Sequence, residues 1–228
     1  MVLIKHIGRY VLETLETTGR LVIFFARAIV HCFRPPYFYR LILKQVIDIG
    51  YYSLPVVGLT TLFSGMVLAL QSYNGFTRFS SESAVATVVA LSITRELGPV
   101  LAGLMVTGRV GSSIAAELGS MKVSDQVDAL RILGTNPFDY LIAPRIIACI
   151  VCLPILVLIG DIIGVFGGFL VGVYKLNFNP ATYLYQTVSY LEPMDIASGL
   201  IKASIFGLLL GVMGLSLIHI SEPTRHNS

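Results

Sequence analysis

The sequence has few charged residues, few cysteines and no tryptophan. Of its 228 residues, 13% are charged and three are cysteine. Typical soluble domains carry about 25% charged residues, so a soluble fold of this size could not cover its apolar residues with a polar surface. The high apolar content also excludes intrinsic disorder, and so few cysteines exclude a disulfide scaffold. The net charge of +3 is too small and too scattered to indicate nucleic-acid binding.

Long apolar stretches are what the sequence does contain. Hydrophobic residues make up 55% of the chain, and the apolar stretches cover residues 47–70, 84–108, 146–174 and 196–218. Each reaches the length of about 20 residues that a membrane-spanning helix needs. Backbone groups in lipid must find partners within their own segment, which favours helices. The sequence therefore predicts an all-α integral membrane protein with four transmembrane helices.

Lysine and arginine are distributed unevenly between the segments that connect these stretches. Most of them precede the first stretch or lie between the second and the third, whereas Arg78 and Lys175 are alone in the other two connections. Basic segments remain on the cytoplasmic side of a membrane. We therefore expect the N-terminus and the middle loop to be cytoplasmic.

The first 36 residues form a separate element. Apolar residues recur near helical spacing over residues 4–30, with charged residues between them, and Pro35 follows. This pattern predicts an amphipathic helix that lies in the membrane interface or, alternatively, packs on a partner subunit. We expect residues 37–214 to form the transmembrane domain.

The middle loop contains a short helix pattern over residues 124–134. Ser124 is a candidate N-cap, and Gly134 is expected to end the helix. The residues expected on one apolar face are Val127, Leu130 and Leu133, and those expected elsewhere on the helix are Asp125, Asp128 and Arg131. The helix could pack beneath the bundle, or it could dock in a groove on a cytoplasmic partner.

Charged residues also occur inside the apolar stretches: Arg95, Glu96, Asp161 and Lys202. A charge near mid-bilayer costs about 3 kcal/mol, so each is a candidate functional residue. Counting residues from the membrane surface places Arg95 and Asp161 at about the same depth, which suggests either a structural ion pair or a role in a lipid pathway. Lys202 could instead extend toward the membrane surface.

Proline and glycine give two further expectations. Pro99 lacks an N–H group, so the carbonyl group of Arg95 loses its helical donor and should be an exposed acceptor. Small residues recur every four positions in the third and fourth stretches, at Gly160, Gly164, Gly168 and Gly172 and at Gly199, Ala203, Gly207 and Gly211. Such stripes predict close helix packing rather than ligand sites.

The stretch SITRELGPVLAGLMVTGRVGSSIAAELGSMKVSDQVDALRILGTNP resembles the MlaE-type (YrbE-like) permeases. The resemblance implies the inner-membrane permease of a bacterial ABC transporter for phospholipids, which acts as a homodimer. It also implies a cytoplasmic ATPase docked on the loop helix and a periplasmic lipid-binding partner of the MCE type. The sequence has no G-x-x-x-x-G-K-[ST] phosphate loop, so ATP hydrolysis is expected in another chain. We expect no cofactor, no metal and no catalytic residues in this one.

The end of the chain departs from that family, whose members have a fifth membrane helix. Here Gly214 is followed by LSLIHISEPTRHNS, of which LSLIHISEPTR resembles a translated sequencing adapter. We expect residues 215–228 to be a non-native tail that cannot supply a further apolar span.

Two other functions are compatible with the composition. A membrane scaffold would anchor partners without moving a substrate, and it would not need charges in mid-membrane. An ion-coupled secondary transporter would be expected to show inverted repeats and discontinuous helices. The permease hypothesis accounts for the charges and for the loop helix together.

Overall fold

The computed structural model describes residues 2–32, 39–77, 84–134 and 138–220. No strand occurs within these ranges, which confirms the predicted all-α class. Four helical segments are long and apolar enough to cross a membrane: Tyr39–Phe76, Ala84–Met121, Tyr140–Tyr174 and Pro193–Gly214. The four predicted spans are therefore confirmed, and the first three helices extend beyond the apolar stretches.

The first two spans are nearly continuous helices that contain π-helical turns. The first consists of α2 (Tyr39–Val46), η1 (Ile47–Tyr51) and α3 (Tyr52–Phe76). The second consists of α4 (Ala84–Ser92), η3 (Ile93–Leu97), α5 (Gly98–Val106), η4 (Thr107–Gly111) and α6 (Ser112–Val123). The turn η3 ends two residues before Pro99, where the sequence predicted an interrupted hydrogen-bond ladder. π-Turns of this kind are frequent at functional sites.

The loop helix and the last two spans complete the chain. After α7 (Gln126–Ile132), the third span consists of η5 (Phe138–Ile142) and α8 (Ala143–Tyr174). A short helix, α9 (Pro180–Ser189), then precedes the fourth span, α10 (Pro193–Ile220). The expected tail is helical over residues 215–220, and residues 221–228 lie outside the described part of the chain.

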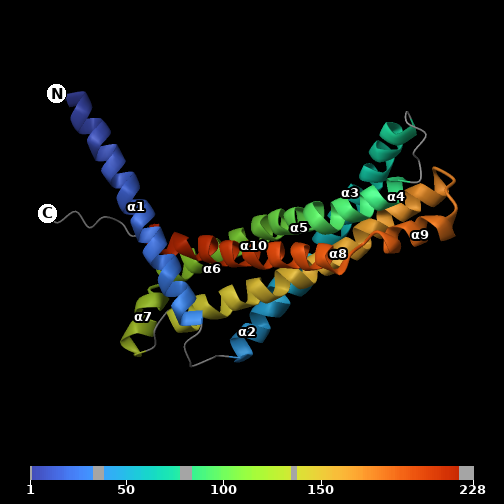
Figure 1. Cartoon of the computed structure of the whole chain (residues 1–228). Helices are drawn as coiled ribbons and strands as arrows, with labels where there is room; N and C mark the ends of the chain where they lie inside the picture. Colours follow the sequence, from blue (N-terminus) through green and yellow to red (C-terminus); the bar gives the residue numbers. More distant parts are fainter. Residues whose placement is uncertain (1, 33–38, 78–83, 135–137, 221–228) are drawn as a thin grey trace.

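Helix α8 is the centre of the bundle and packs along both α3 and α10 (Figure 1). Glycines allow these close approaches. A Cβ atom on Gly65 would collide with the carbonyl oxygen of Gly164, and one on Gly207 would collide with the carbonyl oxygen of Cys149. The prediction that the small-residue stripes are packing faces is therefore confirmed.

Helix α1 (Val2–Cys32) extends away from the bundle near the end that carries α7 (Figure 1). Its C-terminal part packs on the core through Phe25, Ala28 and Cys32. Farther from the bundle, Leu12 and Leu15 are exposed. The predicted N-terminal helix is confirmed, and its location in the membrane interface remains a prediction.

Candidate functional site

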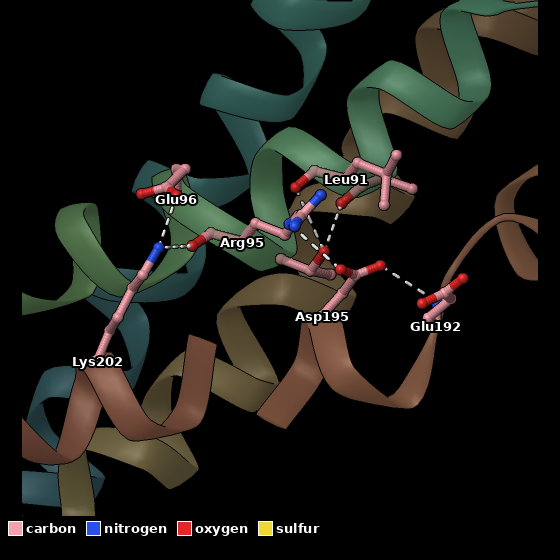
Figure 2. Close-up of polar contacts among 8 residues, drawn as sticks. Leu91, Arg95, Glu96, Glu192, Asp195 and Lys202 are labelled. Atoms are coloured by element: carbon pink, nitrogen blue, oxygen red, sulfur yellow. Dashed lines mark hydrogen bonds and ion pairs between the residues drawn. The ribbon is translucent and has the colours of Figure 1, made fainter. Parts of the chain in front are cut away.

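The four-charge cluster, which we define as Arg95, Glu96, Asp195 and Lys202, joins the second span to the fourth (Figure 2). Arg95 Nε lies 3.2 Å from Asp195 Oδ1, and the two side chains are 56% and 10% exposed. The other oxygen of Asp195, Oδ2, accepts a hydrogen bond from the backbone N–H of Glu192 at 3.2 Å. The carboxylate is thus held from both sides, while much of the guanidinium group stays open to the surroundings.

Lys202 makes the second connection. Its Nζ atom donates to Glu96 Oε1 at 2.6 Å and to the carbonyl oxygen of Arg95 at 2.9 Å (Figure 2). The latter bond confirms that the Arg95 carbonyl group is an available acceptor, as the missing N–H of Pro99 predicted. The alternative that Lys202 extends toward the membrane surface gains no support from these contacts, because its amine bonds to Arg95 and Glu96 of η3.

The predicted ion pair between Arg95 and Asp161 is wrong. Arg95 points to the outside of the bundle and pairs with Asp195, whereas Asp161 is only 6% exposed and packs against Gly98 in the interior. Equal depth along two helices does not fix the direction of their side chains around the helix axes. Asp161 Oδ1 has no hydrogen-bond partner among the described residues.

A further ion pair joins the second span to the third, away from the four-charge cluster. Arg145 NH2 lies 2.7 Å from Glu117 Oε2, with the arginine side chain 4% exposed and the glutamate side chain 53% exposed. Two further nitrogens of this guanidinium group, Nε and NH1, have no partner among the described residues. The pair connects α6 to the start of α8. Sequence reasoning missed these contacts because it searched for charges inside the predicted apolar stretches. Glu117, Arg145 and Asp195 all lie just outside those stretches.

The loop helix begins differently from the prediction. Ser124 is not its N-cap, because the Ser124 hydroxyl group donates to the carbonyl oxygen of Ser120 at 2.8 Å and so belongs to the end of α6. Asp125 has a φ of 53°, and its carbonyl oxygen accepts from the N–H of Ala129 at 3.0 Å. Gly134 has a φ of 73°, which confirms that a left-handed glycine ends the helix.

The residues around α7 have different surroundings. Leu130 is half-buried and packs against the core of the bundle, whereas Leu133 is 78% exposed. Ile132 and Val123, which sequence reasoning did not select, are 86% and 89% exposed. Asp125 is exposed as well, and the predicted side chains outside the described ones are Val127, Asp128 and Arg131. We refer to Val123, Ile132 and Leu133, three exposed apolar residues of the α6–α7 segment, as the apolar tip.

A metal centre finds no support in the described residues, where no group of three or more histidine, cysteine, aspartate or glutamate side chains could hold an ion. The geometry instead combines an exposed charge cluster between apolar spans with an apolar tip outside them. Together these features define a multi-pass helical membrane protein that keeps ionic groups on the surface of its membrane-embedded bundle.

Comparisons with known proteins identify the family. Residues 42–216 match the family model described as Permease MlaE. A probable ABC transporter permease protein of Rickettsia bellii is 59% identical over 92% of this chain and 81% of its own length. The intermembrane phospholipid transport system permease protein MlaE of Haemophilus influenzae is 35% identical over 97% and 85%. The chloroplastic protein TRIGALACTOSYLDIACYLGLYCEROL 1 of Arabidopsis thaliana is 40% identical over 76% and 50%. The chain belongs to the MlaE permease family.

Proposed function

We propose that the chain is the membrane-spanning subunit of an ABC transporter that moves phospholipids between bacterial membranes. The names of the relatives from Rickettsia bellii and Haemophilus influenzae support the transporter class and the substrate class, respectively. The chain carries no phosphate loop, so a separate ATPase subunit supplies the energy. It is a transport subunit rather than an enzyme.

The observation that carries this proposal is the exposure of the four-charge cluster within an apolar surface. Arg95 and Glu96 have side chains that are 56% and 67% exposed. Leu104, Ile201 and Ile205 are exposed apolar residues of the two spans that carry the cluster. Contact between such charges and lipid tails is energetically unfavourable, so this face contacts water, lipid headgroups or a second subunit. The guanidinium group of Arg95 keeps donors available for a phosphate group, which is the group that all phospholipids share.

The α7 region docks the ATPase subunit. The docking residues that we assign are Asp125, Val127, Asp128, Leu130, Arg131 and Leu133, to which the exposed Ile132 is added. Isolated helices this short are marginal in water, so a partner that covers the apolar tip would stabilise it. Leu130 contributes indirectly, since it fixes α7 on the bundle.

The assembly that we propose has two copies of this chain and a periplasmic MCE-type protein. Exposed charges on the face of η3 and α10 favour a second copy there, because that copy would shield them from lipid. The concentration of basic residues before the first span and around α7 favours a cytoplasmic N-terminus in the inner membrane. Helix α1 would then lie in the cytoplasmic interface.

A scaffold without transport and an ion-coupled transporter are the alternatives. Co-purification of the full chain in mild detergent, followed by mass spectrometry of proteins and lipids, separates the three. We expect an ABC ATPase, a second copy and bound phospholipid. Partners without phospholipid would favour the scaffold, and the absence of any ATPase would contradict the proposal.

A further inference from the structure

A cavity of about 210 Å³ lies between the beginning of the first span and the end of the second. Two rows of residues spaced four apart line it: Lys44, Asp48 and Tyr52 on the first span, and Arg109, Ser113 and Glu117 on the second. Asp48 lies at the beginning of the first apolar stretch, and Arg109 directly follows the second stretch. The cavity therefore lies at the boundary of the membrane-embedded part, at the end of the spans that we propose to be cytoplasmic.

Arg109 is half-buried and held in a fixed position in this cavity. Its NH1 atom donates to the hydroxyl oxygen of Ser53 at 2.8 Å and to the carbonyl oxygen of Asp48 at 3.4 Å. Its Cζ atom lies 5.6 Å from the centre of the Tyr52 ring, which is within the range of a cation–π contact. These contacts use one nitrogen and one face of the guanidinium group. The donors on Nε and NH2 have no partner among the described residues.

The other charges that line the cavity are compensated. Glu117 Oε2 lies 2.7 Å from NH2 of Arg145, which is not a lining residue. Lys44 and Asp48 are exposed side chains of opposite charge, four residues apart on the first span, and water screens both of them. Arg109 thus supplies a positive charge that no acid offsets within the described part of the chain.

Ser113 adds a donor of another kind. It follows Arg109 by about one helical turn and lines the same cavity, and its hydroxyl group has no hydrogen-bond partner in the described ranges. The guanidinium fork matches two oxygens of a phosphate group, and a further phosphate oxygen is then available to Ser113. A carboxylate group matches less well, because the fork already uses both of its oxygens. Cavities of about 150 Å³ accept benzene, so this one has room for a phosphate group and part of its ester.

We propose that this cavity binds a phosphate group through Arg109 and Ser113, with Ser53 and Tyr52 holding the guanidinium group in place. Arg109 lies about 20 Å from Arg95 along the second span at 1.5 Å per residue, so the site is separate from the four-charge cluster. The inference goes beyond the proposed function, which needs no phosphate site at this end of the spans. A phospholipid of the adjacent leaflet and a soluble phosphate compound are two sources of the same group, and the test separates them.

The test measures how fast phenylglyoxal, which modifies accessible arginine side chains, reacts with Arg109 in the full chain in a maltoside detergent without phosphate. Mass spectrometry of peptides gives the rate at each arginine. Three additions are compared at equal ionic strength: phosphatidic acid, diacylglycerol with the same acyl chains, and inorganic phosphate. We expect phosphatidic acid to slow the modification of Arg109 about tenfold, the equivalent of one charge-assisted hydrogen bond. Diacylglycerol should have no effect, and Arg27, which is exposed on α1 outside the cavity, should react at an unchanged rate.

Two adjacent serines provide matched variants. Ser113→Ala removes a donor from the cavity and should reduce the protection by phosphatidic acid about threefold, as for the loss of one neutral hydrogen bond. Ser112→Ala is the control, because the Ser112 hydroxyl group donates to the carbonyl oxygens of Gly108 and Arg109 and Ser112 does not line the cavity. This variant should keep the full protection.

The outcomes separate the sources of the phosphate group and decide whether the site exists. Protection of Arg109 by phosphatidic acid but not by inorganic phosphate supports a site reached by lipid headgroups. Protection by inorganic phosphate supports a site open to soluble phosphate compounds. The phosphate site is overturned if neither addition protects Arg109, if diacylglycerol protects it equally, or if Ser113→Ala keeps the wild-type protection. If Ser113→Ala fails to fold, the comparison of phosphatidic acid with diacylglycerol on the wild-type chain still decides. The proposed transport function is tested separately by the co-purification experiment.

Discussion

Two of the ion pairs that connect the spans differ in which partner is exposed, the arginine or the acid. In the pair of Arg145 with Glu117, the arginine side chain is 4% exposed and the acid 53% exposed. In the pair of Arg95 with Asp195, the arginine is 56% exposed and the acid 10% exposed. The difference suggests two roles for the same chemistry. A buried guanidinium group fixes helices to one another, whereas an exposed one, anchored by a buried acid, remains able to bind an anion.

Removal of the acid from the buried-arginine pair should have the largest effect. Glu117→Gln leaves Arg145, which already has two unpartnered nitrogens, as an uncompensated buried charge. We expect a loss of about 3 kcal/mol in the free energy of unfolding. Chemical denaturation of the detergent-solubilised chain measures this, with Glu192→Gln as the control. A loss below about 1 kcal/mol, the level of a surface pair, would show that the pair does not anchor α6.

The apolar tip near the buried-arginine end should be important for association rather than folding. Leu133→Asp places a charge at a 78% exposed position. We expect about thirtyfold weaker binding of the ATPase subunit, a typical effect at an interface hot spot, with normal unfolding. Val188→Asp is the control, because Val188 is 71% exposed on α9 at the other end of the bundle. Leu130→Asp should instead impair folding, since Leu130 packs on the core. If the Leu133→Asp variant bound the ATPase subunit as tightly as the wild-type chain, the assignment of α7 as the docking helix would be contradicted.

Removal of the acid from the exposed-arginine pair should reduce the free energy of unfolding only slightly. Asp195→Asn releases an arginine that is already 56% exposed, so we expect a loss of about 1 kcal/mol, as for surface pairs. The same denaturation experiment measures it beside Glu117→Gln. If both variants lost the same free energy of unfolding, the proposed difference would be contradicted. The pair of Arg145 could then not be said to anchor the helices more strongly than the pair of Arg95.

Tyr183 gives the smallest effect and a pH signature. Burial raises the pKa of Tyr183 from 10.0 to about 12, and its hydroxyl oxygen has no partner among the described residues. The folded state therefore disfavours the phenolate, so the stability is complete below about pH 10 and decreases as the pH rises toward about 12. Tyr183→Phe should change stability at neutral pH by less than about 1 kcal/mol and reduce that decrease. Parallel unfolding curves of both chains against pH measure the difference, and identical slopes would contradict it.

The sequence predicted the structure correctly wherever a feature depends on one continuous segment of the chain. The four spans follow from apolar length, the acceptor at Arg95 follows from Pro99, and the end of α7 follows from Gly134. Contacts between segments were harder to predict. Arg95 was paired with Asp161 on the basis of equal depth alone. That pairing was wrong because depth contains no information about the direction of a side chain around its helix axis. Ser124 fits an N-cap pattern, yet α6 continues far enough to take its hydroxyl group. The partner Asp195 was missed because it precedes the fourth apolar stretch.

The central claim is that this chain moves phospholipid and that the exposed cluster takes part while the buried-arginine pair only supports the fold. The most direct measurement is ATP-dependent transfer of labelled phospholipid in proteoliposomes that contain the chain and its ATPase subunit. We predict transfer by the wild-type chain and a loss of at least about tenfold in Arg95→Ala, the effect of one charge-assisted contact, with the ATPase still bound. The absence of ATP-dependent transfer by the wild-type chain, or full transfer by a folded Arg95→Ala variant, would contradict the account.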